Sequence, residues 1–348
     1  MFTDVGRALR KAQGVIIMHM ADALVMPAVA GAMYVASTAA AGYSIKKVRL
    51  ENEPRQIPAM GVMGAFVFAA QMINFKIPGT GSSGHICGGM LLTAMLGPWA
   101  GFLTMTGILL IQCLMFADGG LLALGCNIWN MAFYGCFVGG LLIWKPIMKN
   151  GATKKKITCA SIAACVLTLQ MGAFSVTLEP LASGITELPF PAFVGVMQPI
   201  HLAIGLAEGA VTAAVLCFVH EARPEMLWRL ETEKEGKFSV RRTLAVLAAA
   251  AAVLAGVVSL GASALPDGLE WSMEQVAGTA DLAAAGGAYE AAESIQGATA
   301  LLPDYAFSFS DSALGTTVSG LFGGVLVILL CVVFCHAIKF FRREKRQL

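Results

Sequence analysis

The sequence predicts an all-α fold, a polytopic transmembrane helical bundle with a seven-span core and a C-terminal two-span hairpin. Of the 348 residues, 57% are hydrophobic and only 13% are charged, and the mean hydropathy is +0.72. Such a composition is foreign to soluble globular domains. Apolar runs of roughly 20 residues, the length that a helix needs to cross a bilayer, recur along the chain. These runs lack the alternating pattern of a membrane β-barrel, so helices are the predicted spanning elements.

Nine apolar segments are the predicted membrane spans. They lie at residues 24–45, 57–75, 84–97, 98–116, 122–144, 157–178, 193–220, 243–264 and 313–338. The third segment, 84–97, would form a helix of only about 20 Å, which is also compatible with a re-entrant loop. A re-entrant loop would place the basic loops 46–55 and 145–156 on opposite sides of the membrane, so the count of crossings favours a span.

The basic residues indicate the orientation of the bundle. Of the 24 Lys and Arg, 20 fall in four segments, namely 46–55, 145–156, 223–242 and the tail after 338. Positively charged loops stay in the cytoplasm. Nine crossings with a cytoplasmic C-terminus put the N-terminus outside. We therefore expect a multi-pass protein of the cell's inner or plasma membrane.

Changes in polarity divide the chain into four parts. They are an N-terminal extension (1–17), a transmembrane domain (18–222), a cytoplasmic linker rich in Glu, Lys and Arg (223–242), and a two-helix domain (243–348). The outer loop of the two-helix domain contains no Lys or Arg and eight acidic residues, which are Asp267, Glu270, Glu274, Asp281, Glu290, Glu293, Asp304 and Asp311. Their field would concentrate cations at the outer mouth, and a plain solvated loop is the alternative.

Two histidines fall on the outer side of this topology. His19 precedes the first span, and His85 follows a Gly-rich loop between the second and third spans. Imidazole is the usual protein ligand for Ni, Co, Cu and Zn, and two histidines from separate loops supply half of a four-coordinate site. The sequence therefore predicts a transition-metal site at the outer mouth of the bundle.

The remaining ligands depend on where the mature chain begins. If it begins at Met18, its free α-amine, the deprotonated amide nitrogen of His19 and the His19 ring would chelate a metal in one plane. Square-planar nitrogen coordination selects Ni(II) or Cu(II) over tetrahedral Zn(II) and over oxygen-bound Mg(II) or Ca(II). If residues 1–17 are present, side chains alone hold the metal.

A misassigned start codon is our preferred explanation of residues 1–17. Arg7, Arg10 and Lys11 would put three positive charges outside, against the charge bias of the other loops. The segment is also too weakly apolar for a signal peptide with a small-residue cleavage site. N-terminal sequencing of the mature protein distinguishes the two possibilities.

Three segments around these histidines resemble one family of metal transporters. They are M-H-M-A-D-A at 18–23, A-Q-M-I-N-F and P-G-T-G-S-S-G-H within 70–85, and A-D-G-G-L-L-A-L-G-C-N at 117–127. On these motifs, the stretch from Met18 to Pro199 resembles the CbiM/NikM family, the metal-capture components of energy-coupling factor transporters for cobalt and nickel. Ala21 and Ala23 depart from the first motif, where Pro and Gly are common in the family. The motif P-D-G-L-E at 266–270 resembles the companion small subunit, so the chain looks like a fusion of the two.

The resemblance implies that the chain is the substrate-specific membrane component of an ATP-driven nickel or cobalt importer. It implies Ni²⁺ or Co²⁺ as the transported substrate, no bound organic cofactor, and Met18, His19 and His85 as metal ligands. It also implies two kinds of partner, a transmembrane scaffold subunit and a pair of cytoplasmic ATPases. The chain contains no G-x-x-x-x-G-K-[ST] phosphate loop, so we expect it not to be an enzyme and expect its partners to hydrolyse ATP. Its other expected contacts are with membrane lipid and not with nucleic acid.

The alternative function is a proton-coupled secondary transporter for divalent metals. His201 and Glu208 are seven residues apart on one face of the seventh predicted span. Ionisable residues inside a membrane are functional candidates. Hydrogen bonding between helices is the simpler role for this pair.

Other polar residues of the motifs have structural interpretations. Asp118 fits the turn of an Asp-Gly-Gly sequence, and Asn127 fits an anchor for a loop or a neighbouring helix. A membrane metalloenzyme would need a general base near the metal, and beyond Asp22 the outer motifs place no carboxylate there. That third reading is therefore disfavoured.

Overall fold

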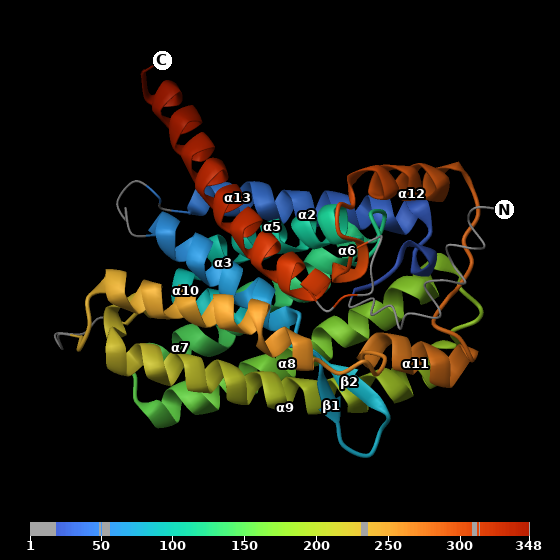
Figure 1. Cartoon of the computed structure of the whole chain (residues 1–348), viewed down its shortest axis with the longest axis horizontal. Helices are drawn as coiled ribbons and strands as arrows, with labels where there is room; N and C mark the ends of the chain where they lie inside the picture. Colours follow the sequence, from blue (N-terminus) through green and yellow to red (C-terminus); the bar gives the residue numbers. More distant parts are fainter. Residues whose placement is uncertain are drawn as a thin grey trace.

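A computed structural model describes residues 19–48, 50, 56–230, 236–307, 312 and 314–347 of the chain. The predicted extension, residues 1–17, and the predicted ligand Met18 lie outside the described residues, as do residues 231–235 of the predicted linker. The all-α prediction is confirmed, because the described part consists mainly of helices that run along the longest axis of the molecule (Figure 1). A single short antiparallel pair of strands accompanies them within the described residues, β1 (Phe75–Ile77) with β2 (Ser82–Gly84).

The helices follow one another with short connections over most of the chain. In order they are η1 (Asp22–Leu24), α2 (Pro27–Lys47), α3 (Gln56–Gln71), α4 (Gly89–Leu96), α5 (Pro98–Phe116), α6 (Leu124–Asn127), η2 (Ile128–Trp144), α7 (Lys145–Met148), α8 (Lys154–Ser183), α9 (Phe190–Ala222), η3 (Pro224–Met226), α10 (Val240–Gly256), η4 (Val258–Gly261), α11 (Gly268–Ala277), α12 (Gly287–Thr299), η5 (Pro303–Tyr305) and α13 (Leu314–Gln347). The elements α6, η2 and α7 form one continuous helix of 25 residues.

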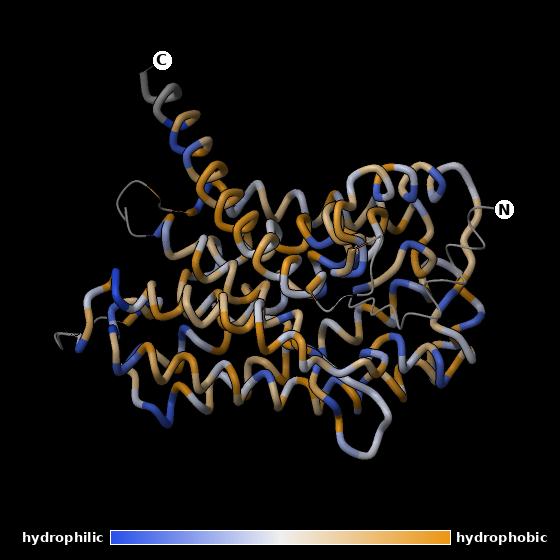
Figure 2. Tube along the Cα trace, in the orientation of Figure 1, coloured by the Kyte–Doolittle hydropathy of each residue, from blue (hydrophilic) through white to orange (hydrophobic). Residues whose placement is uncertain are grey.

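Seven helices in the described part are long and apolar enough to cross a membrane. They are α2, α5, the continuous helix α6–α7, α8, α9, α10 with η4, and α13. Apolar colour follows these helices in Figure 2. Large apolar side chains also stay exposed on their outer faces, such as Leu202, Leu206 and Phe218 on α9. A soluble protein does not expose apolar surface on this scale, so lipid is the surrounding medium.

The other two predicted spans differ from expectation. The segment predicted at 57–75 contains α3, a helix of 16 residues that ends at Gln71. The segment at 84–97 is wrong as one spanning helix, because only the eight residues Gly89–Leu96 are helical and Gly84 belongs to a strand. Gly88, with φ of 83°, takes a left-handed conformation just before α4, and Gly97, with φ of 81°, reverses the chain into α5.

The segment nevertheless passes from one end of the bundle to the other. At its start the rings of His85 and His19 lie together, and at its end the Ala94 carbonyl accepts a hydrogen bond from the Trp228 amide. The distance is covered partly by extended chain and partly by α4, whose residues are all buried. Irregular backbone at membrane depth is tolerated where other protein elements bury it.

The basic connections meet at one end of the bundle, which we call the basic end. Arg342 donates to the Val48 carbonyl at 2.9 Å, and the Trp144 indole donates to the Trp228 carbonyl at 3.2 Å. Lys47 and Arg229 line one cavity at this end. The two histidines lie at the opposite end, which we call the site end, because the 19 residues of α5 separate Gly97 from the site by about 28 Å.

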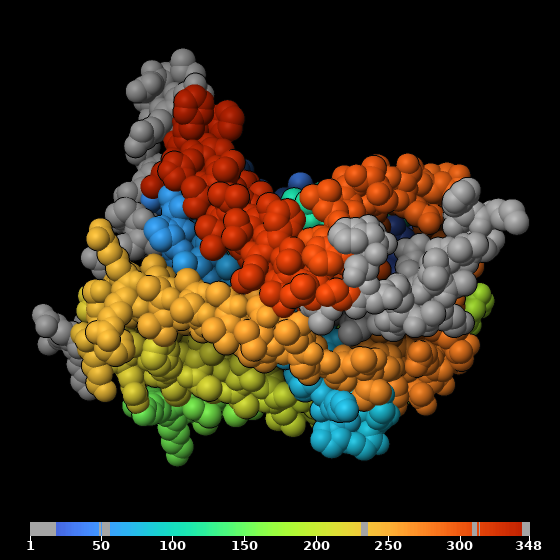
Figure 3. Space-filling model, in the orientation of Figure 1, coloured from blue at the N-terminus to red at the C-terminus, as the bar shows by residue number. Residues whose placement is uncertain are grey.

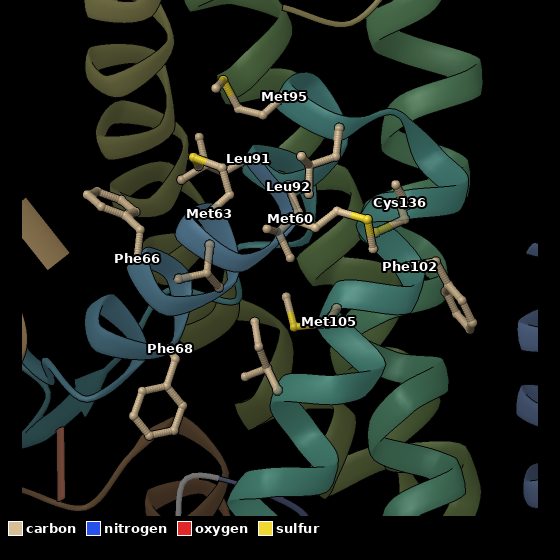
Figure 4. Close-up of a cluster of buried hydrophobic side chains, with 14 of the residues drawn as sticks. Met60, Met63, Phe66, Phe68, Leu91, Leu92, Met95, Phe102, Met105 and Cys136 are labelled. Atoms are coloured by element: carbon tan, nitrogen blue, oxygen red, sulfur yellow. The ribbon is translucent and has the colours of Figure 1, made fainter. Parts of the chain in front are cut away.

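The core forms around the short helix α4. Figure 4 shows Met60 and Met63 of α3 and Met105 of α5 gathered with Leu91 and Leu92 of α4. The backbones of α4 and η2 lie in direct contact. A Cβ added at Gly135 would lie 2.9 Å from the Cα of Gly89. Small residues thus let the two backbones touch, as is usual between helices in lipid.

The C-terminal part packs along the first part instead of standing apart. Helices α10 and α13 lie against α3, and the space between them is so small that a Cβ at Gly323 would lie 2.1 Å from the Phe68 ring. The connection between α10 and α13, predicted as an acidic loop, folds into α11, α12 and η5 at the site end (Figure 1). In Figure 3 the gold to red C-terminal residues cover much of the face in view.

Candidate metal site

The structure brings the two predicted histidines together. The ring centroids of His19 and His85 lie 5.7 Å apart with an angle of 63° between the planes. Both rings line a cavity of about 100 Å³ at the site end. Polar residues from four further elements or loops reach the same cavity, namely Asn127, Asn130, Thr168, His201, Glu208 and Asp267.

A carboxylate orients the ring of His19. Nδ1 of His19 lies 2.9 Å from Oδ1 of Asp118, and both side chains are 1% exposed. The Tyr305 hydroxyl donates to Oδ2 of the same carboxylate at 2.6 Å. Burial alone would raise the pKa of Asp118, but the attraction and hydrogen bonding of His19 and the bond from Tyr305 lower it. Nε2 of His19 is buried and has no hydrogen-bond partner among the described residues.

Side-chain oxygens hold the loop that carries His19. Asn127 binds the backbone of Met20 twice, accepting from its N–H and donating to its C=O, each at 3.1 Å. Oδ1 of Asp22 accepts from the Ala123 N–H at 2.9 Å. Burial raises the pKa of the Asp22 carboxyl. The loop is thereby tied to the start of the continuous helix α6–α7.

The glycines of the Asp-Gly-Gly sequence allow this close approach. A Cβ at Gly119 would lie 2.8 Å from the Cβ of His19, and a Cβ at Gly120 would lie 1.9 Å from Oδ1 of Asp22. Gly119 also has φ of 81°, a conformation that favours glycine. Asp118 was predicted to form a turn, and the structure instead directs its carboxylate at His19. The Asp118-Gly119-Gly120 sequence was the available signal.

The loop after His85 is held from two sides. The side-chain amide of Gln71 donates to the Cys87 carbonyl at 2.8 Å, and Gln112 in turn donates to Gln71 at 3.0 Å. On the other side, both carboxylate oxygens of Glu208 accept backbone hydrogens, from Cys87 at 2.8 Å and from Gly88 at 2.9 Å. Glu208 therefore bonds between helices, as the simpler of its two predicted roles required.

His201 also makes a local bond. Its Nδ1 lies 2.8 Å from the Met197 carbonyl, one turn earlier in α9, so Nδ1 carries the hydrogen. Its ring lines the cavity beside the site histidines. No hydrogen bond joins His201 to Glu208 among the described contacts of the two side chains.

The P-D-G-L-E motif of the C-terminal part lies directly on the site. The Ser83 N–H donates to the Pro266 carbonyl and its hydroxyl to the Leu265 carbonyl, both at 2.8 Å. Asp267 caps α11 by accepting from two backbone N–H groups, and it is 3% exposed. Burial raises the pKa of the Asp267 carboxyl. Gly268 keeps the chain close to α9, since its Cβ would lie 3.2 Å from Cε1 of His201.

Within the described residues, no group of three or more His, Cys, Asp and Glu side chains is arranged to hold a metal ion. Two of the three predicted ligands, His19 and His85, lie together in this part of the chain. The third predicted ligand, Met18, lies outside it.

Both parts of the chain are similar to known proteins. Residues 19–226 match the family model CbiM, described as a cobalt uptake substrate-specific transmembrane region, and residues 241–340 match the PDGLE domain. A putative fused nickel transport protein NikMN of Archaeoglobus fulgidus is 34% identical over 90% of this chain and 96% of its own. The cobalt transport protein CbiM of Sorangium cellulosum is 32% identical over 60% of this chain and 89% of its own.

A solved structure is similar as well. The crystal structure of a truncated transition metal transporter has a TM-score of 0.51 and 29% identity, covering 59% of this chain and 99% of that chain. The predicted resemblance is thus confirmed for both parts of the sequence. The chain is a multi-pass membrane component for metal uptake, and it belongs to the CbiM family with a PDGLE domain fused at its C-terminal side.

Proposed function

We propose that this chain captures Ni²⁺ or Co²⁺ at the outer face of the membrane and delivers it inward as the substrate-specific component of an ATP-driven importer. The observation that supports this most strongly is the meeting of His19 and His85, 66 residues apart in the sequence, at one buried cavity. Relatives named for nickel and for cobalt transport support the choice of substrate.

The metal is held first by the two imidazoles. Asp118 engages Nδ1 of His19, which leaves Nε2 for the ion. A chelate that includes the Met18 amine and the His19 amide uses Nδ1 instead, because that nitrogen lies closer to the residue's own amide. Such a chelate requires the His19 ring to turn over, bringing Nδ1 to the ion and Nε2 toward Asp118. Planar nitrogen coordination would then favour Ni(II).

The parts of the chain have separate roles in this proposal. Residues 18–222 capture the ion, residues 223–242 form a cytoplasmic linker, and residues 243–348 cover the site and support its loops. The gathering of basic segments at one end supports an outer N-terminus and a cytoplasmic C-terminus.

The energy comes from partners. A transmembrane scaffold subunit and a pair of cytoplasmic ATPases drive release, since this chain has no nucleotide phosphate loop. The proton-coupled alternative relies on His201 and Glu208. In the structure the Glu208 carboxylate accepts hydrogen bonds from two backbone N–H groups, and Nδ1 of His201 donates to a backbone carbonyl. These bonds support a structural role for both residues.

Titration calorimetry of the full chain in detergent with Ni(II) and with Co(II) tests metal capture. We expect one ion per chain and loss of binding in His19→Ala and in His85→Ala, because each removes one of two imidazoles. His336→Ala is the matched control, since His336 is exposed on α13 and outside the cavity. Undiminished binding by both site variants would contradict the proposal.

Uptake of radioactive nickel by cells tests the source of energy. Cells that express the chain with scaffold and ATPases should accumulate the ion, and inactivating the ATPases should stop accumulation. Dissipating the proton gradient while ATP is maintained should leave it unchanged. The reverse pattern would establish the proton-coupled alternative.

A further inference from the structure

Glu208 lies where a carboxylate is costly unless it is bonded. It belongs to the membrane-spanning helix α9, and it is 1% exposed. Its two oxygens accept the N–H groups of Cys87 and Gly88, the residues that lead into α4. The peptide groups that lead into a helix point their N–H bonds away from it, and a negative charge there is also favoured by the helix dipole. Glu208 thus binds the two N–H groups that directly precede α4, in the chain after His85.

The bond from the Cys87 N–H to Glu208 lies two residues from a predicted metal ligand, His85. Cys87 is fixed through its N–H by Glu208 and through its C=O by Gln71. Between this fixed peptide group and the strand β2 lie only His85 and Ile86. The backbone that carries His85 is therefore held on both sides, and Nδ1 of the ring lies 3.1 Å from the Ile86 carbonyl. Glu208 is the charged anchor among the described contacts of Cys87 and Gly88.

The same segment of chain also holds the far end of α4. Trp228, six residues beyond the end of α9, donates its N–H to the Ala94 carbonyl at 2.7 Å. A Cβ at Gly97 would lie 2.9 Å from the Trp228 ring, which shows how closely the two segments pack. One continuous stretch, from Glu208 to Trp228, therefore clamps α4 at the site end and at the basic end.

We propose that Glu208 is the positioning residue for His85. This inference rests on the proposed metal capture, and it names the contact that holds one of the two imidazole-bearing loops. The bonds of Glu208 to the Cys87 and Gly88 N–H groups fix the chain that directly follows His85. His19 is held by other groups, among them Asp118 and Asn127, so its position does not depend on Glu208.

The test compares Glu208→Gln and Glu208→Ala with the control Thr104→Val in the full chain. Thr104 is also a fully buried polar residue in a spanning helix, and its hydroxyl donates to the Ala100 carbonyl within α5, away from the cavity and the His85 loop. Each protein is titrated with Ni(II) alone, and the ligand-field absorption of bound Ni(II) is recorded. A purely structural role would change stability without changing that absorption.

We expect Ni(II) affinity to fall about 10-fold or more in Glu208→Gln, the usual range for losing a group that orients a ligand, and further in Glu208→Ala. The absorption of the bound ion should shift in both variants and stay unchanged in Thr104→Val. If Glu208→Ala does not fold, the affinity and absorption of Glu208→Gln decide the test, because glutamine keeps the shape of the side chain and one acceptor oxygen. Affinity and absorption equal to the control, with the unaltered chain binding Ni(II), would overturn this inference alone. Absence of Ni(II) and Co(II) binding by the unaltered chain would overturn metal capture and this inference together.

Discussion

The two halves of the site are supported in different ways. The His19 loop is a short irregular segment, and side-chain oxygens of Asp118 and Asn127 hold it. The His85 loop belongs to a broken helix, and its free backbone groups bind Glu208 and Gln71. The first half depends on a carboxylate that faces the ring itself, and the second on anchors of the backbone. The halves share no anchoring residue among these contacts, so each should fail separately when its own anchors are removed.

The largest effect is expected for Gly119→Ala, which breaks the His19 half. The added Cβ would meet the Cβ of His19 at 2.8 Å, and the residue would be strained at its φ of 81°. Ni(II) binding measured by calorimetry should fall by about 100-fold or more, because ring and carboxylate are both displaced.

Gly79→Ala is the matched control for this change. Gly79 has the same φ of 81°, and an added Cβ would meet nothing within 4 Å. It therefore reports backbone strain without a clash. If both variants lost affinity equally, the close approach of Gly119 to His19 would not matter for the site.

A smaller loss is expected for Asp118→Asn. The amide retains the shape but loses the charge that orients the ring of His19, so affinity for Ni(II) should fall about 10-fold to 100-fold. Asp281→Asn, at an exposed position, should have no effect in the same titration. An unchanged affinity in Asp118→Asn would show that the backbone of the loop suffices to place His19.

The His85 half is tested by Gln71→Met. The variant leaves the buried Cys87 carbonyl without its side-chain donor, and a group of this kind costs about 1–3 kcal/mol when its bond is lost. Affinity should fall about 10-fold, and the Tm in detergent should decrease. Gln170→Met removes a comparable bond to a carbonyl on α9 and should lower only the Tm. Equal Ni(II) affinities in the two variants would show that Gln71 does not support the metal site.

The smallest effect is expected for Tyr305→Phe, which tests the support from the C-terminal part. Losing the hydroxyl that donates to Asp118 removes one hydrogen bond, worth about 1 kcal/mol, or roughly fivefold in affinity. Tyr134→Phe removes a hydroxyl that bonds Ser175 between helices and should leave Ni(II) affinity unchanged. A fivefold loss in Tyr134→Phe as well would indicate general loosening of the bundle.

Much of the architecture could be predicted because membrane spans are local features of a sequence. Seven of the nine predicted spans coincide with long apolar helices. The prediction of one spanning helix for 84–97 was wrong, since hydropathy cannot distinguish a spanning helix from an equally apolar segment buried inside the protein. Gly88, in a left-handed conformation, interrupts the segment, and Gly97, with φ of 81°, ends its helix. The nearest signal was the presence of these glycines in the sequence.

The same contrast holds for the site. The outer position of two histidines and the family-like motifs around them selected His19 and His85, together with Met18, and the metal-binding roles of all three stay predictions. Their anchors were not recognisable in this way, because Asp118, Gln71 and Glu208 are common polar residues whose partners are distant. Asp118 was interpreted as a turn former, and Glu208 as part of a possible proton pathway or as a bond between helices.

Composition, charge distribution and motifs thus determined by themselves that this chain spans a membrane and belongs with metal-uptake components. Only the tertiary structure decided that the two imidazoles share a cavity, that a C-terminal motif lies on the site and that Glu208 holds the broken helix. The physical reason is sequence distance, since the bond from Cys87 to Glu208 joins residues 121 positions apart. Contacts of that range depend on the packing of the whole bundle and leave no local pattern.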